Sequence, residues 1–322
     1  MQWGKVVLWS FLLVFALTAV VVAEPLRIAM STWVGYGPLH LAKAKGFYAE
    51  EGVEVKLITM EEPTPRFAAL AAGRLDGLAS TIDTMILQSK KEIPYVMVLA
   101  LDDSAGGDGI VANKEIKSIA DLKGKKVAFN LGSVSQFWVN VLLQQHGLKE
   151  SDITVVNMSA PDAGAAFVAK KVDAAVTWEP WLTRGKQAPH GHLLIDSSQT
   201  PGLIVDILIF RKDVVEKRSA DIQKVVNAWF RAVDFWKQHP QEANTLMAKA
   251  VGGWLKDPKV FAETLQGVKL LGREENRKFF GTKENPGPIF TTAAKAIQIW
   301  KDFGKLSWEP KPEEIIETKF VQ

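Results

Sequence analysis

Residues 26–47 read LRIAMSTWVGYGPLHLAKAKGF. Leu26, Ile28 and Met30 alternate with their neighbours, as in a strand, and Pro38 then begins a helical pattern that ends at Gly46. The succession continues with strands at 53–57, 76–80 and 95–101 and helices at 66–73 and 83–90. This order, β-α-β-α-β-α-β, predicts a parallel-rich sheet with helices on its faces.

A second α/β unit follows the first. Strands are predicted at 126–130, 153–156, 173–177 and 203–210, with helices from 132 and over 163–171. Beyond Ser219 the pattern is helical to near Lys305. We therefore expect an α/β fold with two lobes, each a mixed sheet flanked by helices, and a helical C-terminal part packed on the first lobe. The first lobe would comprise 24–105 and 207–322, and the second 106–206. The polar loops 102–109 and 197–206 would be the crossings between lobes.

The amino-acid composition excludes several classes of function. The chain has 322 residues, 47% of them hydrophobic and 23% charged, which is typical of a globular protein long enough for two lobes. A net charge of +3 argues against a dedicated nucleic-acid binder. Because cysteine is absent, disulfide frameworks, cysteine zinc sites, iron–sulfur clusters and thiol nucleophiles are excluded.

Residues 1–23 have the layout of a secretory signal peptide. Lys5 precedes an apolar run over 6–22, and Ala23 offers a small residue for cleavage. The run is at the short limit for a membrane span, so an uncleaved anchor stays an alternative. Either way, we expect the body of the protein to be periplasmic or otherwise extracytoplasmic.

Four loops follow predicted strands and carry polar or aromatic side chains. They span residues 31–37, 80–83, 130–136 and 178–180. Ligands of open α/β sheets bind beyond the carboxyl ends of the strands. These loops are therefore expected to converge on one cleft.

Several short blocks carry a family resemblance. They are STWVGYGPL (31–39), AKAKGF (42–47), LAAGRLD (70–76), DLKGK (121–125), VDAA (172–175) and WEPW (178–181). In this order they resemble the substrate-binding proteins of nitrate, sulfonate and taurine ABC importers, a family that includes thiamine-pyrimidine-like members. The resemblance covers about 26–234. It implies a two-lobed periplasmic-binding-protein fold of type II that closes on a small-molecule ligand and delivers it to an ABC permease in the membrane. It implies a monomer, with no cofactor.

The acidic residues near the predicted cleft indicate the charge of the ligand. Carboxylates lie in or beside the cleft loops, whereas few basic residues do; the acids are Asp83, Asp102, Asp103, Asp108, Glu179 and Asp206. We therefore expect a ligand with a positive group, such as an amine, guanidinium or aminopyrimidine; an aminosulfonate would use both of its ends. The alternative is that Asp83 caps a helix and that Asp102 and Asp103 are turn residues.

Other candidate ligand-binding residues are polar or aromatic. Ser133 lies at a helix start, where it could bind an anionic group, cap the helix, or do both. Trp33, Tyr36 and Trp178 could form flat walls of the cleft, or pack in the core. Trp181 is assigned to neither place.

Nothing in the sequence indicates catalysis. The five histidines are scattered, and no nucleophile, Walker or dinucleotide motif is present. Pyrimidine synthases share this fold family, but they rely on a cysteine-rich motif that this chain lacks. We expect a protein that is not an enzyme and holds no metal. The alternatives are a ligand-binding sensor for a membrane receptor and, with less support, a pyrimidine-synthase-like enzyme.

Overall fold

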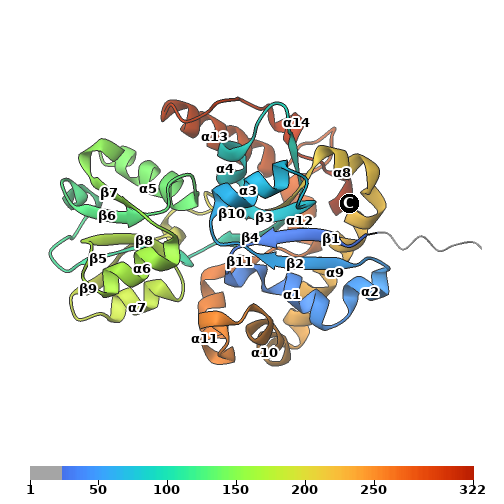
Figure 1. The fold of residues 1–322 in the computed structure, drawn as a ribbon, viewed down its shortest axis with the longest axis horizontal. Coiled ribbons are helices and arrows are strands. Elements are labelled where there is room, and N and C mark those ends of the chain that lie inside the picture. The colour runs from blue at the N-terminus through green and yellow to red at the C-terminus, as the bar shows by residue number, and fades with distance from the viewer. Residues whose placement is uncertain (1–23) are drawn as a thin grey trace, which may run out of the picture.

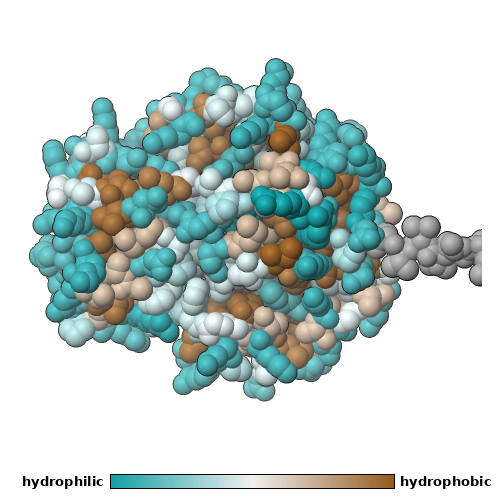
Figure 2. Space-filling view, viewed as in Figure 1, coloured by the Kyte–Doolittle hydropathy of each residue, from teal (hydrophilic) through white to brown (hydrophobic). Residues whose placement is uncertain are grey.

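The computed structural model describes residues 24–322, and the predicted signal peptide lies outside this part. Figure 1 shows two lobes side by side, the smaller of them built from β5 to β9 and α5 to α7. Among residues 24–322, no helix combines the length and apolar character needed to cross a bilayer. Figure 2 shows a largely hydrophilic surface on the viewed face, with apolar patches that are scattered over both lobes.

The first lobe contains a six-stranded sheet in the order β11-β4-β10-β3-β1-β2. Its strands are β1 (Leu26–Met30), β2 (Val55–Thr59), β3 (Gly77–Thr81), β4 (Tyr95–Ser104), β10 (Val205–Arg211) and β11 (Val268–Leu270). β1 runs parallel to β2 and β3, whereas β10 lies antiparallel between β3 and β4. The sheet is therefore mixed, and the strand that returns from the second lobe lies near its centre.

Helices cover both faces of this sheet. They are α1 (Gly37–Ala44), α2 (Phe47–Glu51), α3 (Pro63–Ala71), α4 (Ile82–Gln88), α8 (Lys212–Lys217), α9 (Ser219–Gln238), α10 (Pro240–Val251), α11 (Pro258–Thr264), α12 (Arg273–Phe280), α13 (Pro288–Asp302) and α14 (Pro312–Ile315). In α9, Ile222, Val226, Trp229 and Val233 recur at helical spacing and are fully buried. The predicted packing of the helical C-terminal part on the first lobe is confirmed.

The second lobe contains a five-stranded sheet in the order β7-β6-β8-β5-β9. Its elements are β5 (Asp108–Asn113), β6 (Lys126–Phe129), α5 (Val134–Gln145), β7 (Thr154–Asn157), α6 (Ala160–Val168), β8 (Ala174–Trp178), α7 (Trp181–Gln187) and β9 (Gly191–Asp196). β6 is parallel to β7 and β8, and β5 is antiparallel to β8 and β9. Sequence patterns did not predict β5 or β9.

The prediction of a loop over 102–109 was wrong in extent. β4 continues to Ser104 and β5 begins at Asp108, so only 105–107 cross between lobes. Asp102, Asp103 and Ser104 are poor strand formers by composition. They are strand residues here because their backbones pair with β10 and β11 on either side.

Hydrogen bonds tie the two crossings together. Ser104 Oγ lies 2.7 Å from Asp108 Oδ2 and 2.8 Å from Ser197 Oγ, and Gly106 N donates to Ser197 Oγ at 2.8 Å. A Cβ on Gly107 would lie 2.6 Å from the Trp33 ring and 3.0 Å from a backbone oxygen, so this close approach requires glycine. The crossings therefore form one compact connection.

Asn276 on α12 fixes the C-terminal helices to β4. Its Oδ1 accepts from Ala100 N at 2.8 Å, and its Nδ2 lies within 3.1 Å of the carbonyl oxygens of Ala100, Leu271 and Gly272. The side chain is fully buried, so these groups have no access to water when it is removed.

We predict that Asn276→Ala lowers the free energy of unfolding by about 2–4 kcal/mol, because it leaves buried backbone groups unpaired. Urea denaturation measures the change. The exposed Asn285→Ala is the control and should shift stability by less than about 0.5 kcal/mol. Equal effects of the two substitutions would contradict the role assigned to Asn276.

Candidate functional site

A cavity lies between the lobes, at the carboxyl ends of the parallel strands of both sheets. Residues from the ends of β1, β2 and β3 line it from the first lobe, and residues after β6, β7 and β8 line it from the second. The space open to the centres of water-sized spheres is about 50 Å³. That is room for roughly three to five water molecules at 10–15 Å³ each, which is the scale of a small solute.

Most of the residues singled out from the sequence line this cavity. They are Trp33, Tyr36, Asp108, Ser133, Trp178 and Asp206. Ser133 also caps α5, since its Oγ accepts from Ser135 N at 3.2 Å. The two interpretations of Ser133 are therefore compatible: it caps a helix and faces the cavity.

Asp83 does not line the cavity. It lies in the first turn of α4 and is 1% exposed. Its Oδ2 accepts from Thr84 Oγ1 at 3.1 Å, and burial raises the pKa of its carboxyl to about 7. The helical turn that follows β3 directs this side chain into the first lobe.

Glu179 does not line the cavity either. Its carboxylate accepts from Thr183 N at 3.0 Å and from Thr183 Oγ1 at 2.9 Å. These bonds satisfy free donors at the start of α7. The Glu179 carboxylate thus has its hydrogen-bond partner, Thr183, in its own lobe.

The sequence analysis did not single out several residues that line the cavity. They are Ser31, Glu61, Glu62, Pro63, Arg66, Ser80, Thr81, Thr84, Asn130, Val134, Ser159, Ala160, Pro161 and Ile204. Ser31, Ser80, Thr81, Asn130 and Val134 lie in loops that were expected to converge. Glu61 and Glu62 follow β2, and Ser159 follows β7. Applying the strand-end rule to these two strands would have found them.

Two tryptophans from opposite lobes form an aromatic wall. The rings of Trp33 and Trp178 meet edge to face, with centroids 6.4 Å apart. Trp33 Nε1 lies 3.2 Å from Asp102 Oδ1, whereas Trp178 Nε1 is buried without an acceptor in the described chain. An indole N–H that is dry and unpaired can donate to an acceptor on a bound molecule.

Buried carboxyls lie at the centre of the site. Tyr36 Oη donates to Asp206, which pairs with Asp102 across the β10–β4 ladder. Burial raises the pKa of Asp206 to about 8 and that of Asp108 to about 7. Burial and the neighbouring Asp206 raise the pKa of Asp102 well above its usual range. Near neutral pH, part of this acidic set therefore carries protons.

Arg66 changes the charge expected for the cavity. It is 4% exposed, on α3, and the one basic residue among the cavity-lining residues within 24–322. Its Nη1 donates to Met60 O at 3.1 Å, while its Nε has no acceptor in the described chain. The sequence indicated few basic residues in the cleft loops, and Arg66 adds a positive charge that those loops do not supply. Arg66 lines the cavity from helix α3 rather than from one of the four strand-end loops.

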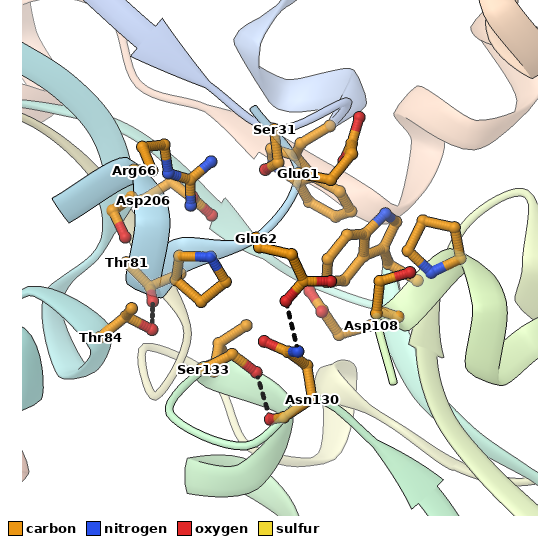
Figure 3. Close-up of a pocket in the computed structure, with 18 of the residues that line it drawn as sticks. Ser31, Glu61, Glu62, Arg66, Thr81, Thr84, Asp108, Asn130, Ser133 and Asp206 are labelled. Atoms are coloured by element: carbon orange, nitrogen blue, oxygen red, sulfur yellow. Dashed lines mark hydrogen bonds between the residues drawn. The ribbon is translucent and has the colours of Figure 1, made fainter. Parts of the chain in front are cut away.

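The remaining polar side chains of the cavity differ in whether their oxygen atoms have hydrogen-bond donors. Glu61 accepts from the backbone and hydroxyl of Thr32. Glu62 Oε2 accepts from Asn130 Nδ2 at 2.7 Å, a bond that joins the two lobes, and Asn130 Oδ1 is left without a donor in the described chain. Figure 3 shows Arg66 and Asp206 at the left, Asp108 at the right and Asn130 below, with the Glu62 carboxylate at the centre directed toward Asn130.

Comparison with known proteins places this arrangement in a family. A family model described as NMT1/THI5 like matches residues 33–243. The chain belongs to the NMT1/THI5-like family. This confirms the resemblance inferred from the short sequence blocks.

Three relatives illustrate the range of the family. The chain is 24% identical over 317 residues to the taurine-binding periplasmic protein of Escherichia coli, covering 93% of this chain and 94% of that protein. It is 23% identical over 302 residues to the 4-amino-5-hydroxymethyl-2-methylpyrimidine phosphate synthase of Aspergillus parasiticus, covering 88% and 81% of the two chains. The solved aliphatic sulphonate binding protein SsuA from Escherichia coli is similar in structure, with a TM-score of 0.72, 22% identity and coverage of 93% and 99%. The predicted two-lobed periplasmic-binding-protein fold is confirmed.

We predict that Asp206→Asn changes how stability depends on pH. The buried carboxyl holds its proton to about pH 8, whereas an unfolded aspartate loses it near pH 4. The folded state therefore binds more protons in this window, and the wild type loses stability as pH rises through it. The melting temperature of Asp206→Asn, relative to wild type, should rise by about 5 °C between pH 5 and pH 8.

The exposed Asp302→Asn serves as the control, and its difference from wild type should stay constant over the same range. A difference for Asp206→Asn that does not vary with pH would show that its carboxyl is ionised in the folded protein.

Proposed function

We propose that this chain is the extracytoplasmic solute-binding component of an ABC importer. It captures a small polar nitrogen- or sulfur-containing compound by closing its lobes, and it presents the closed form to a membrane permease. The observation that carries the proposal is the cavity itself, since it is enclosed by polar and aromatic side chains from both lobes. The taurine-binding relative supports the same role.

Closure follows from where the binding groups lie. Trp33 and Glu62 belong to the first lobe, and Trp178 and Asn130 to the second, so a ligand that contacts all four bridges the lobes. A molecule that binds only the closed form shifts the population toward it. We propose that the lobes turn about the crossings at 105–107 and 200–204, which lie within the loops 102–109 and 197–206 proposed from the sequence as crossings.

The charges in the cavity favour a ligand with a positive or donor-rich group. Glu62 and Asp108 face the cavity, and Asn130 Oδ1 needs a donor. Arg66 Nε and Trp178 Nε1, in contrast, need acceptors. An amine, guanidinium or aminopyrimidine would satisfy the first set, and an aminosulfonate would satisfy both sets. The ligand classes proposed from the sequence are thus kept, and Arg66 adds weight to the last.

Two other functions would use the same fold. A sensor would pass the closed lobes to a membrane receptor rather than to a permease. A pyrimidine-synthase-like enzyme finds its support in the Aspergillus relative. Because the chain has no cysteine, we infer that it binds its ligand without turnover.

We predict that native mass spectrometry of freshly purified protein detects a small bound molecule that is lost on denaturation. Taurine, ethylamine and guanidinoacetate should be screened by thermal shift alongside, since a ligand that binds only the folded state raises the melting temperature. Failure to find either a bound molecule or a shift with any probe would contradict a solute-binding role. Conversion of a bound molecule to product would favour the enzyme.

We predict that substitutions of Glu62 and Arg66 differ in their effects on the two probes. Glu62→Gln should weaken binding of taurine and ethylamine by roughly 10- to 100-fold, because a charged hydrogen bond contributes about 1.5–3 kcal/mol. Arg66→Gln should weaken binding of taurine by a similar factor and leave that of ethylamine unchanged. Isothermal titration calorimetry measures both. The exposed Glu115→Gln is the matched control, and losses that are the same for both probes in both variants would refute the assigned orientation.

A further inference from the structure

Trp181 makes a contact between the lobes that the cavity does not include. It begins α7 in the second lobe, and its indole meets that of Trp254 in the first lobe, in the short helix Gly253–Leu255 between α10 and α11. The ring centroids are 6.2 Å apart and the planes are inclined by 62°. Neither residue lines the cavity. Trp181 thus belongs neither to a lobe core nor to the ligand-binding wall.

A second contact between the lobes has a different character. Phe137 of α5 packs on Trp300 of α13 with centroids 5.4 Å apart, and both side chains are fully buried. Trp300 Nε1 donates to Asp83 O at 2.9 Å, so this contact is apolar and its polar atom is paired. In Figure 1, α5 faces α4 and α13 in the upper part of the molecule, whereas α7 and α11 lie in the lower part. The two contacts therefore lie on different sides of the interface.

The Trp181–Trp254 contact is the weaker of the two. Both side chains are only partly buried, and both Nε1 atoms are shielded from water with no acceptor in the described chain. An N–H that loses water without gaining a partner offsets part of the stabilisation from ring packing. When the lobes separate, these N–H groups regain water. This contact can therefore part while the contact between Phe137 and Trp300 is kept.

The segment that precedes Trp181 also contributes a residue to the lining of the cavity. Trp178 lies three residues earlier and lines the site. The carboxylate of Glu179 holds the first turn of α7 through Thr183, and the Arg184 guanidinium lies 4.6 Å from the Trp181 ring centroid. A ligand in contact with Trp178 would thus lie close along the chain to the Trp181–Trp254 pair, across a turn that is held by the bonds of Glu179.

We propose that Trp181 and Trp254 form a clasp that holds the two lobes closed and so raises ligand affinity without touching the ligand. The proposal rests on lobe closure as described under the proposed function. Apparent affinity is the intrinsic affinity multiplied by the fraction of protein in the binding-competent form. A contact made only in the closed form raises that fraction. Trp181 and Trp254 are then positioning residues, and Trp254 acts from a segment that is remote in sequence from every cavity-lining residue.

The absence of cysteine makes the test direct. Spin labels on Lys43→Cys in α1 and Lys117→Cys in the second lobe report the distance between lobes, because both lysines are exposed and no native thiol competes. Double electron–electron resonance is recorded on ligand-free protein carrying Trp254, Trp254→Ala or Trp254→Phe. Trp308→Ala is the matched control, since Trp308 is a partly buried tryptophan that packs within the first lobe.

We expect a short-distance population in the labelled parent that falls about fivefold relative to the open form in Trp254→Ala. Trp254→Phe should restore most of it, and Trp308→Ala should leave it unchanged. Trp181→Ala should reproduce the loss from the other lobe, and the double variant Trp181→Ala/Trp254→Ala should lose no more than either single variant. If the substitutions acted by general destabilisation, their effects would add in the double variant. Comparison of the double variant with the two single variants therefore excludes that explanation.

Distances in Trp254→Ala that equal those of the parent would overturn the clasp, and so would a parent with no short-distance population. Both outcomes are read without any ligand. They are therefore separate from a failure to find a bound solute, which would count against the proposed function. If taurine shifts the melting temperature, its dissociation constant should rise by the same factor in Trp254→Ala as the closed population falls.

Discussion

Strand β10 is the constraint on which the rest of the molecule depends. It returns from the second lobe and inserts antiparallel between β3 and β4, so the second lobe is an insertion into the first sheet rather than a domain on a flexible linker. The two crossings are thereby brought side by side, where Ser104 is hydrogen-bonded to both Asp108 and Ser197. The same insertion carries Asp206 to the edge at which β3 ends. The connection between the lobes and the centre of the site thus have one structural cause.

The electrostatics of the cavity depend on the protonation and hydrogen bonding of buried carboxyls in the first lobe. Asp102 and Asp206 are opposite each other in the ladder, and burial favours their protonated forms. Tyr36 and Trp33 donate to them, which satisfies the oxygens without adding charge. Arg66 brings a positive charge to the same region. The site therefore contains a basic residue as well as acidic ones, rather than being uniformly acidic.

Contacts between the lobes differ in place and in burial. The Glu62–Asn130 bond crosses the cavity and is formed by residues that line it. The Phe137–Trp300 packing is fully buried and gives the lobes a fixed point of contact. The proposed clasp of Trp181 and Trp254 lies apart from both. A change in affinity can arise at any of these places, which is why the ligand-free distance measurement separates closure from recognition.

The sequence by itself determined the order of most elements, though not β5 and β9. It also determined the two α/β units and the strand-end loops that supply Trp33, Ser133 and Trp178. These follow from local periodicity and from the rule that parallel strands place their carboxyl ends at one edge. Tertiary structure alone decided that Glu62 and Arg66 line the cavity and that Glu179 instead accepts hydrogen bonds from Thr183 in the first turn of α7, because side-chain direction depends on the exact start of a helix. It also decided that residues 102–104 form a strand, since hydrogen bonds to β10 and β11 outweigh their weak intrinsic preference. The partner of a buried carboxylate, and the meeting of Trp181 with Trp254, are properties of distant segments that only folding brings together.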